Sequence, residues 1–127
     1  LAPGKGINMG DGWETRRSRG KNFDWLIIKC AAVARVNKIQ IDTHHFKGNY
    51  PDQCSIQASL VKGQPSAKKI ISMSKKWKNL LNKVKLKAHK IHSFKNELMK
   101  KNKINYIRLN IFPDGGISRI RLLGKIE

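Results

Sequence analysis

The sequence predicts an all-β fold, an antiparallel β-sandwich, because apolar and polar residues alternate over several short segments. This period of two is typical of strands that bury one face. Between the segments lie clusters of Gly, Pro, Asn and Asp, the residues that tight turns favour. Short strands joined by such turns, in a chain of 127 residues, indicate one sandwich domain or one repeat of a longer protein.

The predicted strands follow one another along the chain. The first, residues 23–30, is almost continuously apolar, as expected of a central strand covered on both faces. The turn sequences GNYPD at 48–52 and PDGG at 113–116 separate later strands. Four further segments alternate and are expected to be half-buried strands: residues 38–43, 53–60, 107–111 and 119–122.

Residues 77–91 are compatible with two kinds of element. Alternation at residues 84–88 predicts a strand. Spacing of three and four residues predicts an amphipathic helix equally well, and the pattern alone leaves both structures open. The apolar residues with this spacing are Trp77, Leu80, Leu81, Val84, Ala88 and Ile91.

The net charge of +19 comes mainly from lysine, which outnumbers arginine 20 to 7. Specific contacts to nucleic acid favour arginine, and the lysine-rich stretch 62–103 carries no glycine-aromatic RNA-binding signature. Lys, Asn and Ile make up 45 of the 127 residues, and all three have A/T-rich codons. We therefore interpret the excess charge as a solvated lysine surface and expect no specific nucleic-acid partner.

Two further features concern the compartment. Cys30 and Cys54 lie in strand-like apolar runs without CxxC spacing, which predicts buried free thiols in a reducing compartment, the cytoplasm. No apolar run reaches about 18 residues, so no membrane-spanning helix is expected.

The acidic residues point to candidate sites, because six of the eight fall in four short segments. Clustered carboxylates beside Trp, His and turn residues suggest a maintained constellation in an otherwise basic chain. The segments are NMGDGWETRR (8–17), FDW (23–25), IDTHHFKGNYPD (41–52) and RLNIFPDGG (108–116).

The first segment combines both signs of charge. Arg16 and Arg17 are suited to binding a substrate carboxylate bidentately, while Glu14 or Asp11 would handle protons. The alternative is a salt-bridged loop that orders the edge of the sandwich.

The third segment places two further candidates before a turn. His45 and Lys47 share one side of the chain ahead of Gly48 and Asn49, an arrangement that suits acid-base work or anion binding. The alternative for a lone His is a satisfied structural residue. Asp52, after Pro51, fits a turn cap.

The fourth segment sets two polar residues on one strand face. Arg108 would bind a carboxylate and Asn110 would hydrogen-bond an amide, both leading to the turn at Asp114. Asp114 fits either a turn cap or a substrate-binding role.

Together the segments resemble allantoicase, an amidinohydrolase that degrades ureides. They appear in the family's order and cover nearly the whole chain, although Asn82 stands where the family usually has Pro. The matching stretches are MGDGWETRR (9–17), DW (24–25), IDTHHFKGNYPDQCSI (41–56) and RLNIFPDGGISRIRLLG (108–124).

The resemblance implies a fold as well. The family has two homologous repeats, each a jelly-roll β-sandwich of the galactose-binding-like type. Residues 1–127 resemble one repeat, the C-terminal one, without its first strand, which would precede Leu1. The resemblance also implies that residues 77–94 are mostly loop and strand.

The implied activity is hydrolysis of allantoate to ureidoglycolate and urea in purine catabolism, with allantoate as small-molecule substrate and a partner repeat or homo-oligomer. Alternatively, the chain is a non-catalytic ligand-binding or structural repeat. No cofactor is predicted. A divalent metal stays open, because Asp11, Glu14, His45 and Asp114 offer oxygen and nitrogen donors, but their spacing is no ligand signature.

We hypothesise roles from the chemistry of allantoate, which carries one carboxylate and two ureido groups on one carbon. His45 with Glu14 or Asp11 would activate water or protonate the departing urea, and Lys47 would stabilise developing negative charge. The residues expected to bind substrate are Arg16, Arg17, Asn49, Arg108, Asn110 and Asp114.

Overall fold

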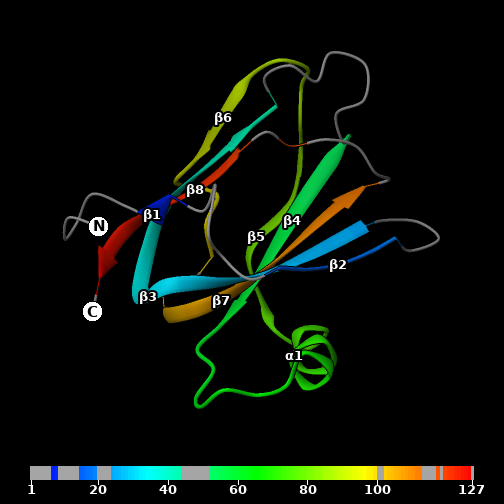
Figure 1. Ribbon diagram of the computed structural model, residues 1–127. Coiled ribbons are helices and arrows are strands. Elements are labelled where there is room, and N and C mark those ends of the chain that lie inside the picture. Colours follow the sequence, from blue (N-terminus) through cyan, green and yellow to red (C-terminus); the bar gives the residue numbers. More distant parts are fainter. Residues whose placement is uncertain are drawn as a thin grey trace.

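The structure, a computed structural model, describes residues 7–8, 15–19, 24–43, 52–99, 102–112, 117 and 119–126. For residues 7–8, 15–19 and 24 it describes the backbone alone. The described elements are β1 (Ile7–Asn8), β2 (Thr15–Arg19), β3 (Asp24–Asp42), β4 (Gln53–Ser59), α1 (Ala67–Ser74), β5 (Lys78–Lys85), β6 (Ile91–Phe94), β7 (Lys103–Phe112) and β8 (Arg119–Ile126) (Figure 1).

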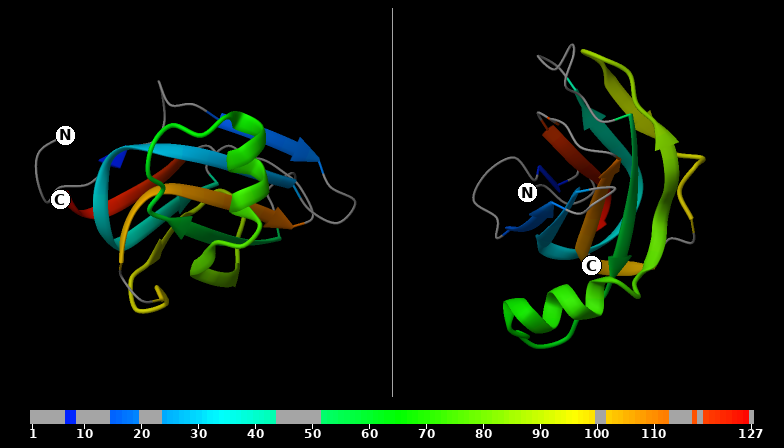
Figure 2. Two further views of the ribbon diagram at one scale, coloured as in Figure 1. Left: turned by 90° about the horizontal axis from the view of Figure 1, so that it is seen from below. Right: turned by 90° about the vertical axis from the view of Figure 1, so that its right-hand side faces the viewer.

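The long strand β3 organises the sheet, because its two halves have different neighbours. Residues 24–29 lie between β2 and β7, and β4 and β5 continue the sheet beyond β7. We call this part the α1 sheet. Residues 34–42 pair with β8, beyond which lies β1, and residues 39–42 also pair with β6 on their other side; we call this part the β8 sheet. Register shifts between Lys29 and Ala34 accompany the bend of β3, and the ribbon curls so that the two parts enclose one interior (Figure 2).

The main core fills this interior. All described strand pairs are antiparallel, so the predicted antiparallel sandwich is confirmed. Most alternating apolar residues of the predicted strands form the core, and Cys30 and Cys54 are free and buried within it, as predicted. Leu60 is the exception, because β4 ends at Ser59 and Leu60 is exposed. The fully buried members of the core include Ile28, Ile39, Ile41, Cys54, Ile56, Leu81, Ile107 and Leu122.

Three local expectations needed correction or a decision. The runs 23–30 and 38–43 are parts of one strand, β3, and not of two. The amphipathic helix over 77–91 is wrong, because β5 and β6 lie there, as the family resemblance implied. The helix α1 was not anticipated at all.

Helix α1 has a local cause and a defined place. The side chain of Ser66 caps it by accepting a hydrogen bond from the backbone N–H of Lys69 at 3.2 Å. A second apolar cluster, around Ile27, Ile70 and Trp77, packs the helix against the outer face of the α1 sheet (Figure 2). This face is therefore partly covered, and its polar residues Ser55, Arg108 and Asn110 are buried.

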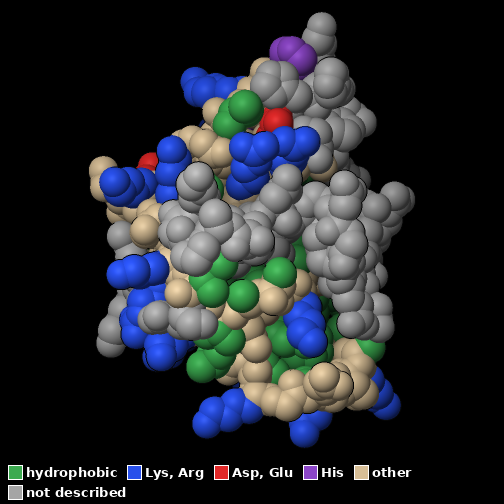
Figure 3. All heavy atoms as spheres, turned by 60° about the vertical axis from the view of Figure 1, so that its left-hand side comes forward, with side chains coloured by type: hydrophobic (Ala, Val, Ile, Leu, Met, Phe, Trp, Pro, Cys, Tyr) green, Lys and Arg blue, Asp and Glu red, His purple; other side chains and the backbone are tan. Residues whose placement is uncertain are grey.

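Charged side chains are distributed widely over the described surface. Figure 3 shows Lys and Arg at many separate places on one face, with few acidic groups among them. Among the described residues, no helix is long and apolar enough to cross a membrane.

Candidate functional site

The structure describes two of the predicted site residues in full. Arg108 and Asn110 lie on β7, and both are buried, with exposed fractions of 5% and 6%. Arg16 and Arg17 lie on β2, of which the backbone is described. The other predicted residues lie outside the described part of the chain: Asp11, Glu14, His45, Lys47, Asn49 and Asp114.

Arg108 is held by three neutral neighbours. Its Nε donates to Oδ1 of Asn110 at 3.0 Å, and its Nη1 donates to Oγ of Ser74 at 2.9 Å. The guanidinium carbon lies 4.7 Å from the centroid of the Trp25 ring, a cation–π contact. Burial lowers the pKa of Arg108, because desolvation disfavours the charged form.

The strand register explains why these groups meet. Residues directly opposite one another on adjacent strands share a face of the sheet. Arg108 is opposite Ile27 on β3 and Gln57 on β4, while Asn110 is opposite Trp25 and Ser55. Two rows of side chains therefore cross the outer face of the α1 sheet, and Ser74 at the end of α1 closes over them.

Asn110 continues the network toward β4. Its Nδ2 donates to Oγ of Ser55 at 3.3 Å and to Oε1 of Gln57 at 3.1 Å. Nε2 of Gln57 donates in turn to the backbone oxygen of Trp77 at 2.8 Å. Both amide N–H groups of Asn110 are used in this way, so its Oδ1 is directed at Arg108, and its substrate-binding role stays a prediction.

The charge of Arg108 is not neutralised by any described side chain. Its described hydrogen-bond partners are Asn110 and Ser74, and a guanidinium has five N–H donors. Buried cations are usually paired, because an uncompensated buried charge is strongly destabilising. An arginine with spare donors and no described carboxylate partner is suited to receive an anion.

A pocket gives such an anion access. It has a volume of about 320 Å³ and is lined by Gln57, Lys75, Arg108, Asn110 and Phe112. Nζ of Lys83 lies 4.0 Å from the centroid of the Phe112 ring, which adds a third cation near the pocket. The pocket thus combines two cationic groups in its lining with one aromatic wall.

The register also separates the two arginines of β2. Arg16 is opposite Ile27, the residue that is itself opposite Arg108. Arg17 is opposite Leu26, which packs against the main core. The backbone therefore places Arg16, and not Arg17, in the row that contains Arg108.

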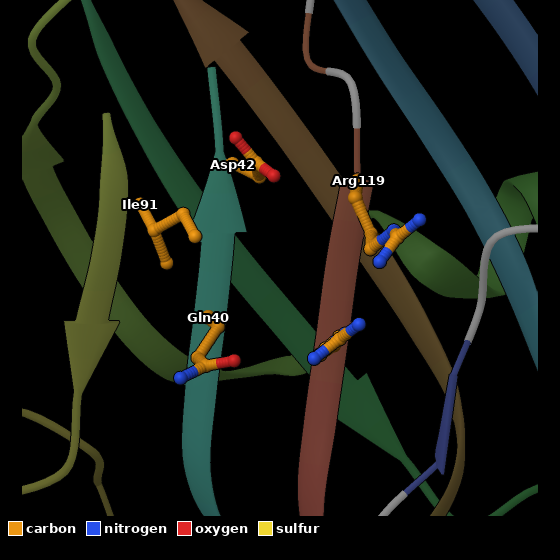
Figure 4. Close-up of a pocket in the computed structure, with 5 residues that line it drawn as sticks. Gln40, Asp42, Ile91 and Arg119 are labelled. Atoms are coloured by element: carbon orange, nitrogen blue, oxygen red, sulfur yellow. The ribbon is translucent and has the colours of Figure 1, made fainter. Parts of the chain in front are cut away.

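A second, smaller pocket lies on the outer face of the β8 sheet (Figure 4). Its volume is about 60 Å³, and Gln40, Asp42, Ile91, Arg119 and Arg121 line it from β3, β6 and β8. Asp42 is directly opposite Arg119, so a carboxylate accompanies the arginines here. The charge of this pocket is mixed, unlike that of the Arg108 pocket.

Four of the predicted site residues outside the described part of the chain fall in two connecting segments of the sequence. Residues 44–51 connect β3 to β4, and residues 113–118 connect β7 to β8. Asp42 pairs with Arg119 at one end, and Gln53 pairs with Phe112 at the other. The strand ends that bound the two segments are therefore paired with one another, and one of them is the end of β7, the strand that carries Arg108.

Sequence reasoning missed the other members of the site. Alternation does place Ser55 and Gln57 on the polar face of their strand, a signal that was available. Trp25 and Phe112 lie within two of the acidic segments but were given no role, and nothing in the pattern marked Ser74 or Lys75. All four lie near Arg108 only through the fold.

Comparison with curated proteins gives a consistent family. The chain matches the allantoicase repeat over residues 1–127. A probable allantoicase of Pseudomonas fluorescens is 51% identical over 127 residues, covering 100% of this chain and 38% of that protein. The chain thus spans little more than a third of the length of the curated relatives it matches.

Solved structures agree. An allantoicase from Saccharomyces cerevisiae is 36% identical with a TM-score of 0.65, covering 98% of this chain and 35% of that one. A chitosan-binding module of a Paenibacillus chitosanase/glucanase is 14% identical with a TM-score of 0.56, covering 88% of this chain and 76% of that one. At that identity the likeness shows the fold alone. With a full-length match to the repeat and a jelly-roll β-sandwich of the galactose-binding-like type, the chain belongs to the allantoicase family.

Proposed function

We propose that this chain is one repeat of a two-repeat, cytoplasmic enzyme that hydrolyses allantoate to ureidoglycolate and urea, an amidinohydrolase acting on a linear amidine. Family membership supports the reaction class. The observation that carries the proposal is Arg108, a buried arginine with neutral described partners that lines an open pocket. Allantoate has one carboxylate, and Arg108 would bind it.

The chemistry of the pocket fits such a substrate. A guanidinium binds a carboxylate through two parallel N–H···O bonds, each charged hydrogen bond contributing roughly 1.5–3 kcal/mol. Lys75 lines the same pocket, and its ammonium group would donate hydrogen bonds to the oxygen of a ureido group. The aromatic wall at Phe112 suits a planar ureido group.

The remaining roles follow from the reaction. Arg16 supports Arg108 at the carboxylate, and Asn49 binds a ureido group, with Asp114 at the adjacent turn. His45 with Glu14 or Asp11 activates water or protonates the departing urea, and Lys47 stabilises developing negative charge. A second repeat or a second copy of the chain completes the assembly.

The experiment is urea release from allantoate by the 127-residue chain, and by the same chain joined to a second allantoicase repeat. Steady release above that of heat-inactivated protein from either form supports the proposal. Release that Arg108→Ala leaves within about threefold would remove Arg108 from the carboxylate role. No release from the joined form would instead favour a ligand-binding or structural repeat.

A further inference from the structure

We propose that Gln57 is a positioning residue for Arg108 and acts through Asn110. The inference rests on the proposed function, because it assumes that Arg108 binds the substrate carboxylate. Gln57 was not among the residues that the sequence singled out. It belongs to a chain of three hydrogen bonds on the outer face of the α1 sheet, which runs from the backbone oxygen of Trp77 through Gln57 and Asn110 to Arg108.

The network has one direction. The backbone oxygen of Trp77 only accepts hydrogen bonds, so Nε2 of Gln57 must face it, at 2.8 Å. Nε2 of Gln57 also donates to the backbone oxygen of Lys75 at 3.4 Å, and this oxygen likewise only accepts hydrogen bonds. Oε1 of Gln57 is thereby turned away from both carbonyls and toward Asn110.

This orientation then sets that of Asn110. Oε1 of Gln57 accepts from Nδ2 of Asn110 at 3.1 Å, which turns Oδ1 of Asn110 toward Nε of Arg108, at 3.0 Å. If the Asn110 amide were reversed, its NH₂ would meet the Nε–H of Arg108, and two donors would face each other. Gln57 therefore selects the one amide orientation that lets Asn110 accept from Arg108.

Holding Nε in this way fixes the direction of the guanidinium plane. The Trp25 ring contacts the guanidinium, and Ser74 takes one N–H of Nη1. The remaining edge is then available to the pocket that Gln57 itself lines. Bidentate recognition depends on this alignment, so loss of Gln57 should weaken carboxylate binding without removing any ligand contact of Arg108.

The test compares two small ligands on the unchanged chain and on variants. Hydantoate carries a carboxylate and one ureido group on a single carbon, and N-carbamoylglycinamide replaces that carboxylate with an amide. Gln57→Leu should weaken hydantoate binding, measured by calorimetry, about tenfold and should change amide binding less than about twofold. The matched control is Gln40→Leu, a half-buried glutamine on the β8 sheet, which should change neither.

A double-mutant cycle separates positioning from direct contact. If Gln57 acts only through Asn110, adding Gln57→Leu to Asn110→Ala should weaken hydantoate binding by less than a further factor of about two. Additive losses would overturn the inference, because Gln57 would then contact the ligand itself. Gln57→Met keeps the length of the side chain and provides the same cycle if Gln57→Leu does not fold.

Different outcomes test the carboxylate site and the role of Gln57. Absence of hydantoate binding by the unchanged chain would overturn the proposed carboxylate site and the role of Gln57 with it. Binding that depends on Arg108 but is unchanged by Gln57→Leu and Gln57→Met would overturn only the role of Gln57.

Discussion

The outer faces of the α1 sheet and the β8 sheet look alike in sequence and differ in structure. Each has an arginine and polar neighbours at alternate positions, around Arg108 in one case and around Arg119 and Arg121 in the other. On the β8 sheet, Arg119 is exposed and has Asp42 directly opposite. On the α1 sheet, α1 covers the face, and the described partners of the buried Arg108 are neutral. The candidate site is therefore marked by an arginine without a described carboxylate partner, and not by an arginine alone.

The largest expected effect comes from exchanging the two arginines for alanine. In an active assembly, Arg108→Ala should lower kcat/KM for allantoate about 500-fold, or about 4 kcal/mol, because a desolvated charge pair with the substrate is lost. Arg119→Ala should stay within about twofold. Arg108→Lys should recover only part of the loss, since an ammonium lacks the planar fork. Equal effects of the two alanine variants in a urea-release assay would mean that the substrate does not distinguish Arg108 on the α1 sheet from Arg119 on the β8 sheet.

Burial of ionisable groups in the main core should appear as pH-dependent stability. Burial raises the pKa of Cys30 and of Cys54 to about 12 from an ordinary 9.0. Between these values the native state binds more protons than the unfolded state, so stability is complete below pH 9 and falls as the pH rises toward 12. At about pH 10 the loss should be about 1.4 kcal/mol for each thiol.

Denaturant unfolding at several pH values measures this loss. A Cys30→Ala, Cys54→Ala variant should be less stable near neutral pH, because it leaves cavities, and should lack this part of the alkaline decline. An identical decline in both proteins would mean that the thiols do not titrate in the way their burial requires.

Much of the fold follows from the sequence, and the reason is local. Alternation along residues 38–43, 107–111 and 119–122 identified which side chains point to the interior, because a strand has a fixed period. The pattern did not decide the structure of residues 77–91, because their apolar residues fit both helix and strand spacing. Helix α1 was missed because its eight residues make only about two turns and give little periodic signal.

The site was predicted less completely, for a non-local reason. Arg108 and Asn110 could be placed on the polar face of their strand, but burial of that face depends on α1, a separate element. Ser74 lies 34 residues from Arg108 in the chain, and Gln57 lies 53 residues from Asn110. No spacing rule connects such residues, whereas the strand register does.

A substitution that adds a carboxylate beside Arg108 should make the outer face of the α1 sheet resemble that of the β8 sheet in charge. Asn110→Asp keeps an oxygen that accepts from Nε of Arg108 and adds a carboxylate beside it. The internal anion should compete with a ligand carboxylate and weaken hydantoate binding about tenfold. Asp42→Asn on the β8 sheet makes the reverse change and should alter binding less than about twofold. Unchanged hydantoate affinity in Asn110→Asp would show that binding does not depend on neutral side chains around Arg108.

The smallest expected effect distinguishes the two neighbouring arginines of β2. The register puts Arg16 in the row of Ile27 and Arg108, while Arg17 is opposite Leu26, on the side of the core. A second cation near a carboxylate already held by a guanidinium contributes less than the first, because it acts from farther away and is partly screened by solvent. Arg16→Ala should therefore raise KM for allantoate about fivefold with little change in kcat, whereas Arg17→Ala should leave KM within about twofold. Steady-state kinetics in an active assembly measures both constants, and a larger KM effect for Arg17→Ala would mean that the row defined by the strand register is not the one that binds substrate.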